Sequence, residues 1–280
     1  MLLQRILVSI VFTPLAFWVI YAGGVPLALI LTVVLGIAAW ELAGLFRAGG
    51  FRPANFLLVG GVVGIMAGRY GGFLVGDPFA HDALVIVAVL FGVMVYYILA
   101  FERGQGRGGT DMMITLGGIF YVGFLGSYLF VLRTIPSGVW WLMVTLPAVW
   151  LIDSGAYLIG RQWGRRIIPH PFSPHLSPKK TWEGFFGGLL AGTIGNALLC
   201  MALQALAGEI GPTPGQSAVL GFVLALLTPL GDLGKSMFKR QVGIKDSGRL
   251  IPGHGGALDR LDTWLWAGVI GYYMVIWFFS

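Results

Sequence analysis

Residues 218–262 read AVLGFVLALLTPLGDLGKSMFKRQVGIKDSGRLIPGHGGALDRLD. An apolar run passes here, without a break, into a segment that is crowded with charges of both signs. Four acids lie between Gly231 and Asp262, together with six bases: Asp232, Asp246, Asp259 and Asp262; Lys235, Lys239, Arg240, Lys245, Arg249 and Arg260. Because charge next to a lipid bilayer is costly, such a cluster indicates a function or a specific set of partners.

The composition assigns the chain to the membrane class. Of its 280 residues, 57% are hydrophobic and only 11% are charged, and the mean hydropathy is +0.84. A soluble domain carries about a quarter charged residues. The single cysteine, Cys200, excludes an internal disulfide and a cysteine metal site. The sequence has no P-loop and no Gly-rich nucleotide fingerprint after a strand, and we expect no nucleic-acid partner.

Hydropathy predicts an all-α polytopic membrane protein with about nine transmembrane helices. Each apolar span is long enough, or nearly so, to cross a hydrocarbon core of about 30 Å. The first span has the apolar character of a signal peptide, but only Arg5 precedes it and further spans follow, so we interpret it as a retained helix. The predicted spans are Ile6–Tyr21, Pro26–Phe46, Phe56–Val75, Ala83–Phe101, Met112–Leu132, Val139–Gly160, Gly184–Leu206, Ala218–Phe238 and Leu261–Phe279.

Basic residues predict an orientation with the N-terminus inside and the C-terminus outside. If the spans alternate, all of the 18 Lys and Arg residues except Arg69 and Arg133 fall on the cytoplasmic side or its flanks. Two cytoplasmic loops in the C-terminal half, 161–182 and about 239–260, are long and charged. We therefore expect a protein of the cytoplasmic (inner) membrane whose site faces the cytoplasm.

The two halves of the chain differ in polarity. Residues 1–135 have short loops and few polar residues within helices, which predicts a scaffold half, whereas residues 136–280 form the working half of one membrane domain. No sequence repeat is evident, so the chain gives no support to an inverted-repeat transporter. A transporter or channel that uses Asp153, Asp232 and Lys235 as a relay remains the alternative from another functional class.

The helix that begins near Ala218 should be kinked or broken by Pro229. Beyond Pro229, one helix face holds Asp232, Lys235, Ser236 and Lys239, at i, i+3, i+4 and i+7. The alternatives are a stripe of Asp232, Lys235 and Ser236 packed against another helix, or lysines that reach for the membrane interface. The latter explains the lysines but not Asp232.

Asp259 and Asp262 open the last predicted helix and share a face. Carboxylates at a helix N-terminus are ordinary partners of the helix dipole. If Asp232 lies close to Asp259, the two form an oxygen site suited to Mg²⁺, which takes one or two carboxylates and completes its shell with water and phosphates. His254 has no other His or Cys nearby, so a hydrogen bond to phosphate is the favoured role.

Two segments have the composition of phosphate sites. The turn at Gly253, Gly255 and Gly256 can present backbone N–H groups to an anion. The segment 177–183, SPKKTWE, places bases and hydroxyls at a helix start, which suits phosphate binding or contact with anionic lipid. Asp153 fits an ion pair with Arg161 and a position lining a cavity equally well.

Residues 236–262, SMFKRQVGIKDSGRLIPGHGGALDRLD, resemble the C-terminal motif of the phosphatidate cytidylyltransferases, also called CDP-diacylglycerol synthases. The segments SPKKTWEG at 177–184 and DSGAY at 153–157 resemble two further blocks of that family. Ser154 stands where the family more often has Thr, which keeps the hydroxyl. The resemblance is specific over residues 153–262 and general over the N-terminal half.

The resemblance implies transfer of a cytidylyl group from CTP to phosphatidic acid, giving CDP-diacylglycerol and pyrophosphate. It also implies Mg²⁺ held by Asp232 and Asp259, a potassium-like monovalent cation nearby, and a homodimer in the lipid bilayer. A CTP-dependent lipid kinase and a cytidylyltransferase for ether lipids are nearer alternatives.

We assign a role to each candidate on this basis. Asp232, Lys239, Asp246 and Asp259 are the expected catalytic residues, with Asp232 and Asp259 as metal ligands. The expected substrate-binding residues are Ser177, Lys179, Lys180, Thr181, Ser236, Arg240, Lys245, His254, Gly255, Gly256, Arg260 and Asp262.

Overall fold

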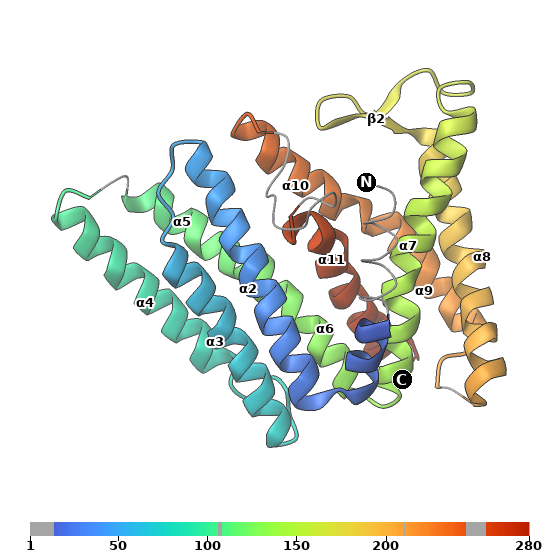
Figure 1. Ribbon diagram of the computed structural model, residues 1–280, viewed down its shortest axis with the longest axis horizontal. Coiled ribbons are helices and arrows are strands. Elements are labelled where there is room, and N and C mark those ends of the chain that lie inside the picture. Colours follow the sequence, from blue (N-terminus) through green and yellow to red (C-terminus); the bar gives the residue numbers. More distant parts are fainter. Residues whose placement is uncertain (1–13, 106–107, 210, 245–255, 280) are drawn as a thin grey trace.

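The computed structural model describes residues 14–105, 108–209, 211–244 and 256–279. They form a bundle of long helices that run side by side across the molecule (Figure 1). In order, the elements are α2 (Gly24–Ala48), α3 (Asn55–Leu74), α4 (Asp82–Glu102), α5 (Gly108–Gly118), the π-helix η1 (Ile119–Phe124), α6 (Leu125–Thr134), α7 (Gly138–Trp163), β1 (Pro171–Ser173), β2 (Ser177–Thr181), α8 (Trp182–Ala207), α9 (Pro214–Leu227), α10 (Pro229–Gln241), α11 (Leu258–Met274) and the π-helix η2 (Val275–Phe279).

Seven helical segments in the described part of the chain are long and apolar enough to cross a membrane. They correspond one to one with the predicted spans from the second to the eighth, and α11 with η2 corresponds to the ninth. Only the end of the first predicted span is described, as a helix over 14–22. The chain is thus an all-α polytopic membrane protein, and the total of nine spans stays a prediction.

The chain turns sharply between that first helix and α2. Gly23 and Gly24 adopt φ values of 61° and 44°, which side chains other than Gly rarely tolerate. From α6, Arg133 donates through Nε to the carbonyl of Ile20 at 2.7 Å and through Nη2 to that of Tyr21 at 2.9 Å. These contacts satisfy carbonyls that the helix end leaves without an intrahelical donor, and they connect α6 to the turn.

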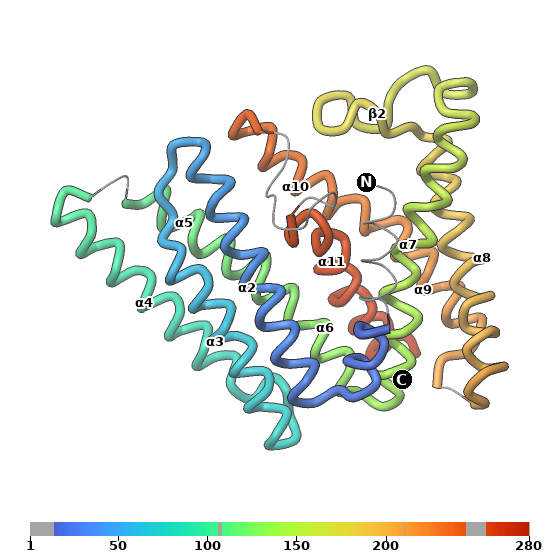
Figure 2. Tube along the Cα trace, viewed as in Figure 1, coloured from blue at the N-terminus to red at the C-terminus, as the bar shows by residue number. Residues whose placement is uncertain are grey.

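Small residues allow the central helices to approach closely, as is common between helices in lipid. An ideal Cβ on Gly126 of α6 would lie 2.4 Å from a methyl group of Leu35 in α2 and 3.0 Å from one of Leu265 in α11. On the other side of the bundle, a Cβ on Gly155 of α7 would lie 2.2 Å from Cβ of Ala191 in α8. Figure 2 shows the resulting group of α7, α8 and α9 beside the central helices.

Pro229 breaks the eighth span as predicted. Helix α9 ends at Leu227 and α10 begins at Pro229, and the Thr228 side chain donates to the carbonyl of Leu224 at 2.7 Å. In Figure 1, α10 takes a different direction from α9 and lies next to the start of α11. The break therefore brings the charged face of α10 to α11.

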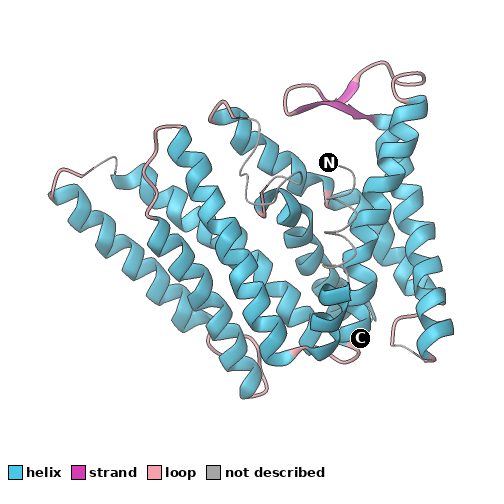
Figure 3. Ribbon diagram, viewed as in Figure 1, coloured by secondary structure: helices cyan, strands magenta, loops and turns pink. Residues whose placement is uncertain are grey.

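The C-terminal ends of α2, α4, α7 and α10 all lie toward the upper end of the molecule in Figure 1. Spans that alternate in direction require every second connection to lie on the same side of the membrane, and this arrangement meets that requirement. The loop after α7 also contains an element without a sequence signal: β1 and β2 pair as an antiparallel hairpin, with Pro171 opposite Thr181 and Ser173 opposite Ser177, drawn as the magenta strands in Figure 3.

Candidate active site

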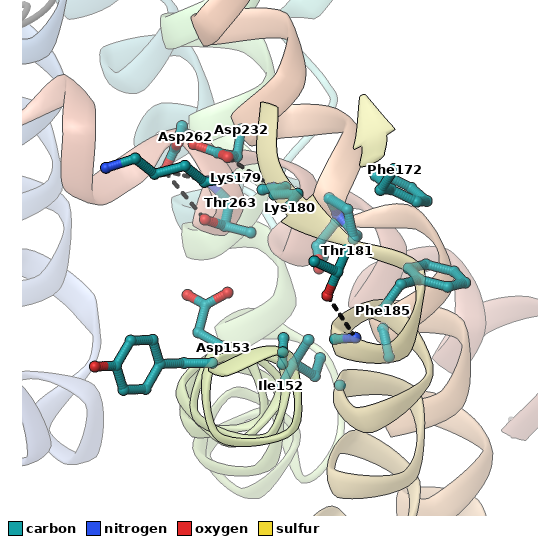
Figure 4. A pocket seen from close by; sticks show the side chains of 18 of the residues that line it. Ile152, Asp153, Phe172, Lys179, Lys180, Thr181, Phe185, Asp232, Asp262 and Thr263 are labelled. Carbon is teal, nitrogen blue, oxygen red and sulfur yellow. Dashed lines mark hydrogen bonds and ion pairs between the residues drawn. The ribbon is translucent and has the colours of Figure 1, made fainter. Parts of the chain in front are cut away.

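A pocket of about 580 Å³ opens where α7, α8, α10, α11 and the β-hairpin meet (Figure 4). Its apolar wall consists largely of small side chains such as Ala156, Gly160 and Gly188. Four acids and four bases also line it: Asp153, Asp232, Asp259 and Asp262; Arg161, Lys179, Lys180 and Lys235. Candidate residues from the segment 153–181 and from the segment 232–262 therefore line the same cavity.

The three aspartates of α10 and α11 surround the ammonium group of Lys235. Nζ of Lys235 lies 3.4 Å from Oδ1 of Asp232, 3.2 Å from Oδ1 of Asp259 and 2.5 Å from Oδ2 of Asp262. Lys235 is only 5% exposed and Asp262 only 3%. Buried charges are stable only when they are paired and hydrogen-bonded, so these four side chains depend on one another.

Two further lysines extend this cluster. Lys239, one turn beyond Lys235, lies 3.1 Å from Oδ1 of Asp259. From β2, Lys180 reaches Oδ2 of Asp232 at 2.7 Å. The predicted closeness of Asp232 to Asp259 is thus observed through a shared partner, Lys235, and Lys180 links the β-hairpin directly to α10.

Aromatic stacking holds the hairpin against α8. The ring of Phe172 in β1 stacks on Phe185 with a centroid separation of 5.1 Å and contacts Trp182 at 4.8 Å. The Thr181 hydroxyl accepts from the backbone N–H of Gly184 at 3.1 Å and caps α8. Lys179 and Lys180 are therefore presented to the pocket from a fixed strand, as Figure 4 shows.

The buried carboxylate of Glu183 fixes the chain that leads into the hairpin. Its Oε1 accepts from the backbone N–H groups of Ile167 and Ile168, both at 2.9 Å, and its Oε2 accepts from that of Arg165 at 3.1 Å. Arg165 has φ of 64°, so this turn adopts a backbone conformation that is unfavourable for a residue with a side chain. Glu183 stabilises the turn from the first residues of α8.

We expect Glu183→Ala to release the segment 165–181 while the helical bundle stays folded. Three backbone N–H groups lose their charged acceptor together, and hydrogen bonds to a charged group are the stronger kind. Limited trypsin digestion should therefore cleave after Arg165, Arg166, Lys179 or Lys180 at least several-fold faster than in the unmodified protein. Glu102→Ala, at the exposed end of α4, is the matched control, and equal cleavage of the two variants would show that Glu183 does not hold this turn.

A second buried acid reaches the site from the N-terminal half. Oε2 of Glu41, in α2, accepts from the backbone N–H of Leu258 at 2.8 Å, at the first residue of α11. The Glu41 carboxylate also packs against Gly256, where an ideal Cβ would lie 2.3 Å from Oε2. The backbone N–H of Gly256 donates to Oδ2 of Asp259 at 3.4 Å. Glu41 thus contacts the segment that carries Asp259.

Asp153 is exposed and faces the pocket from α7 (Figure 4). Of its two proposed roles, a position lining the cavity is the one that the structure supports. Arg161 Nη1 donates to the hydroxyl of Tyr157 at 3.3 Å, one turn away on the same helix.

The other predicted site residues are distributed around the cluster. Ser177 lies in β2 opposite Ser173, and Ser236 is half-buried on α10. Arg240 and Arg260 are exposed at the end of α10 and the start of α11. Lys245, Asp246, His254 and Gly255 lie outside the described residues, so their predicted roles stay predictions.

Sequence reasoning missed the roles of Lys235, Glu183 and Glu41. Helical spacing predicts the correct helix face for Lys235, but the sequence indicates no role for it at the site outside the transporter alternative. Glu183 belongs to the quoted motif 177–184, which is the one signal that could have directed attention to it. Glu41 had only its charge within an apolar helix, which is itself a functional signal.

The site has a donor set for a hard cation. Among the residues that the structure describes, no three Asp, Glu, His or Cys side chains gather closely enough to enclose a metal ion alone. Asp232 and Asp259 offer two carboxylates to one cavity, which fits Mg²⁺ with its remaining ligands from water and phosphate. The formal charges of the four acids and four bases that line the pocket cancel, so a polyphosphate would need an added cation to be strongly attracted.

Comparisons with known proteins agree on one family. The model of the cytidylyltransferase family matches residues 3–278. A protein named phosphatidate cytidylyltransferase from Synechocystis sp. is 30% identical, over 98% of this chain and 96% of its own. Proteins of the same name from Staphylococcus saprophyticus and Mycobacterium leprae are each 32% identical, over 94% and 95% of this chain and 93% and 82% of their own.

Proposed function

Because the chain belongs to the cytidylyltransferase family, we propose that it is an enzyme that makes CDP-diacylglycerol from CTP and phosphatidic acid. A phosphate oxygen of phosphatidic acid attacks the α-phosphorus of CTP, the bond from that phosphorus to the bridging oxygen breaks, and pyrophosphate leaves. The observation that carries the proposal is that Asp232, Asp259 and the three lysines Lys179, Lys180 and Lys235 line one pocket.

The nucleophile needs no strong general base, because the lipid phosphate is already anionic at neutral pH. Catalysis then consists of bringing two polyanions together and stabilising charge on the α-phosphate and on the leaving pyrophosphate. Lys180 and Lys239 are suited to this task, since each pairs with an aspartate and can transfer that ion pair to a phosphate. Lys179, exposed on β2 at the pocket, can bind a further phosphate oxygen.

Asp232 and Asp259 would hold Mg²⁺, with Asp262 supporting them through Lys235. The ion would supply Lewis-acid stabilisation of the phosphate charge. The pocket is lined by Lys179 and Lys180 of the loop after α7, a loop that the basic residues predict to be cytoplasmic, which supports a site facing the cytoplasm, where CTP is found. The acyl chains would remain in lipid, because each CH₂ kept there contributes about 0.8 kcal/mol. A homodimer stays a prediction.

Purified protein in lipid nanodiscs tests the proposal directly. We expect CTP labelled at the α-phosphate, phosphatidic acid and Mg²⁺ to give labelled CDP-diacylglycerol, identified by mass spectrometry, and no product in the presence of a chelator. Diacylglycerol and an ether-lipid phosphate in place of phosphatidic acid test for a CTP-dependent lipid kinase and for an ether-lipid enzyme. A folded preparation that forms no CDP-diacylglycerol would contradict the proposal, and CTP-independent solute flux in proteoliposomes would favour a transporter.

A further inference from the structure

The ammonium group of Lys235 occupies the place of a bound cation. Four oxygens surround it: the three aspartate oxygens at 2.5–3.4 Å and the main-chain carbonyl of Asp259 at 3.4 Å. An ammonium group and a potassium-like ion have the same charge and prefer the same oxygen ligands. With 5% of its surface exposed, Lys235 has exchanged most of its hydration for these oxygens.

The number of carboxylates explains why a cation is required at this position. Asp232, Asp259 and Asp262 bring three negative charges together at the boundary of two helices. Asp262 is the most buried of them and has the shortest contact with Lys235. Removal of a partner from a buried ion pair is strongly destabilising, because the remaining charge is left uncompensated. Without a cation at the position of Nζ, α10 and α11 would repel each other where the site forms.

The family resemblance implied a separate monovalent cation beside the divalent one, and the side chains of this chain do not fit that expectation. The position between Asp232, Asp259 and Asp262 that such an ion would take is filled by the ammonium group of Lys235, whose stem comes from the same helix as Asp232. We propose that Lys235 is a covalently attached monovalent cation, so that this protein neither needs nor binds free potassium at the aspartate cluster. The expected effect on catalytic turnover rests on the proposed function, whereas the expected effect on stability does not.

Replacement of Lys235 by Met should convert the protein into one that depends on monovalent cations. Met keeps a long apolar stem and removes only the charged end. At constant ionic strength, with choline as the bulky replacement ion, we expect the thermal midpoint and the CDP-diacylglycerol rate of the unmodified protein to be the same in choline and in K⁺. In choline, Lys235→Met should have a lower midpoint and at least 10-fold lower activity, and K⁺ or NH₄⁺ should restore both substantially.

Two further variants separate this explanation from a general loss of stability. Lys239→Met removes a lysine from the same helix that contacts Asp259 alone among the three aspartates, and its midpoint and its residual activity should be the same in choline and in K⁺. In Lys235→Met/Asp262→Asn, one carboxylate charge is gone, so the cation dependence of the midpoint should be much weaker.

Several results would overturn the inference. These are a requirement of the unmodified protein for K⁺, equal behaviour of Lys235→Met in choline and in K⁺, and failure of that variant to fold in either salt. The thermal midpoints decide the matter even if the unmodified protein makes no CDP-diacylglycerol, in which case the proposed function alone fails.

Discussion

Replacement of Asp259 by Asn should lower kcat for CDP-diacylglycerol synthesis by on the order of 10³-fold, the upper end for loss of one charge-stabilising group. Asp259 is the side chain shared by most of the site: it contacts Lys235 and Lys239 and accepts from the backbone of Gly256. Asn has the same shape and keeps one acceptor oxygen, but it lacks the negative charge that the proposed Mg²⁺ site requires. The measurement is single-turnover product formation over a range of Mg²⁺ concentrations.

The fold should survive this substitution, because Asp262 and Asp232 still compensate Lys235. In the unmodified protein, Mg²⁺ together with CTP should raise the thermal midpoint, and in Asp259→Asn this increase should be lost. Asp153→Asn is the matched control, since it neutralises a carboxylate of the same pocket that comes from α7, and its loss of activity should be much smaller. Near-normal turnover of Asp259→Asn would remove this residue from the metal site.

Hydropathy predicted the helices well because each one is determined by its own residues. Every predicted span from the second to the ninth corresponds to an observed helix. Helix α9 ends before Pro229, because proline has no backbone N–H to continue the helical hydrogen bonds. The last helix begins at Leu258, so that Asp259 lies in its first turn as expected, although the apolar span itself starts only at Leu261. The hairpin of β1 and β2 could not be predicted in this way, since PFS and SPKKT show no apolar alternation.

The sequence predicts that Asp259 and Asp262 share a helix face and that Asp232 lies near Asp259, but it does not predict which side chains contact these aspartates. Helical spacing placed Lys235 on the face of Asp232, but its contacts with Asp259 and Asp262 depend on how α10 packs against α11. The same holds for Glu183, whose three donors lie 15–18 residues earlier in a turn without a sequence signal. Glu41 lies 217 residues before its partner Leu258. Contacts of this kind arise from tertiary packing, which a single sequence does not encode locally.

The N-terminal half, predicted to be a scaffold, should therefore affect the site through Glu41. Gly256→Ala would place a methyl group 2.3 Å from Oε2 of Glu41, which no side chain tolerates without displacement. The carboxylate would move away from the N–H of Leu258, and the start of α11, which carries Asp259, would shift with it. Overpacking and loss of a charged hydrogen bond together cost about 2–5 kcal/mol. We expect a clearly lower thermal midpoint and a fall in kcat of at least 10-fold.

A double-mutant cycle shows whether Glu41 is the cause. Glu41→Ala alone should also lower the midpoint, because the Leu258 N–H loses its acceptor. In that background, however, Gly256→Ala should add little, since the methyl group enters the space that the carboxylate has left. If Gly256 instead acts only by presenting its N–H to a phosphate, Ala keeps that N–H, and the effects of the two substitutions should add independently. Additive losses would thus disprove the contact as the reason for glycine at 256, whereas strong coupling would show that α2 positions Asp259.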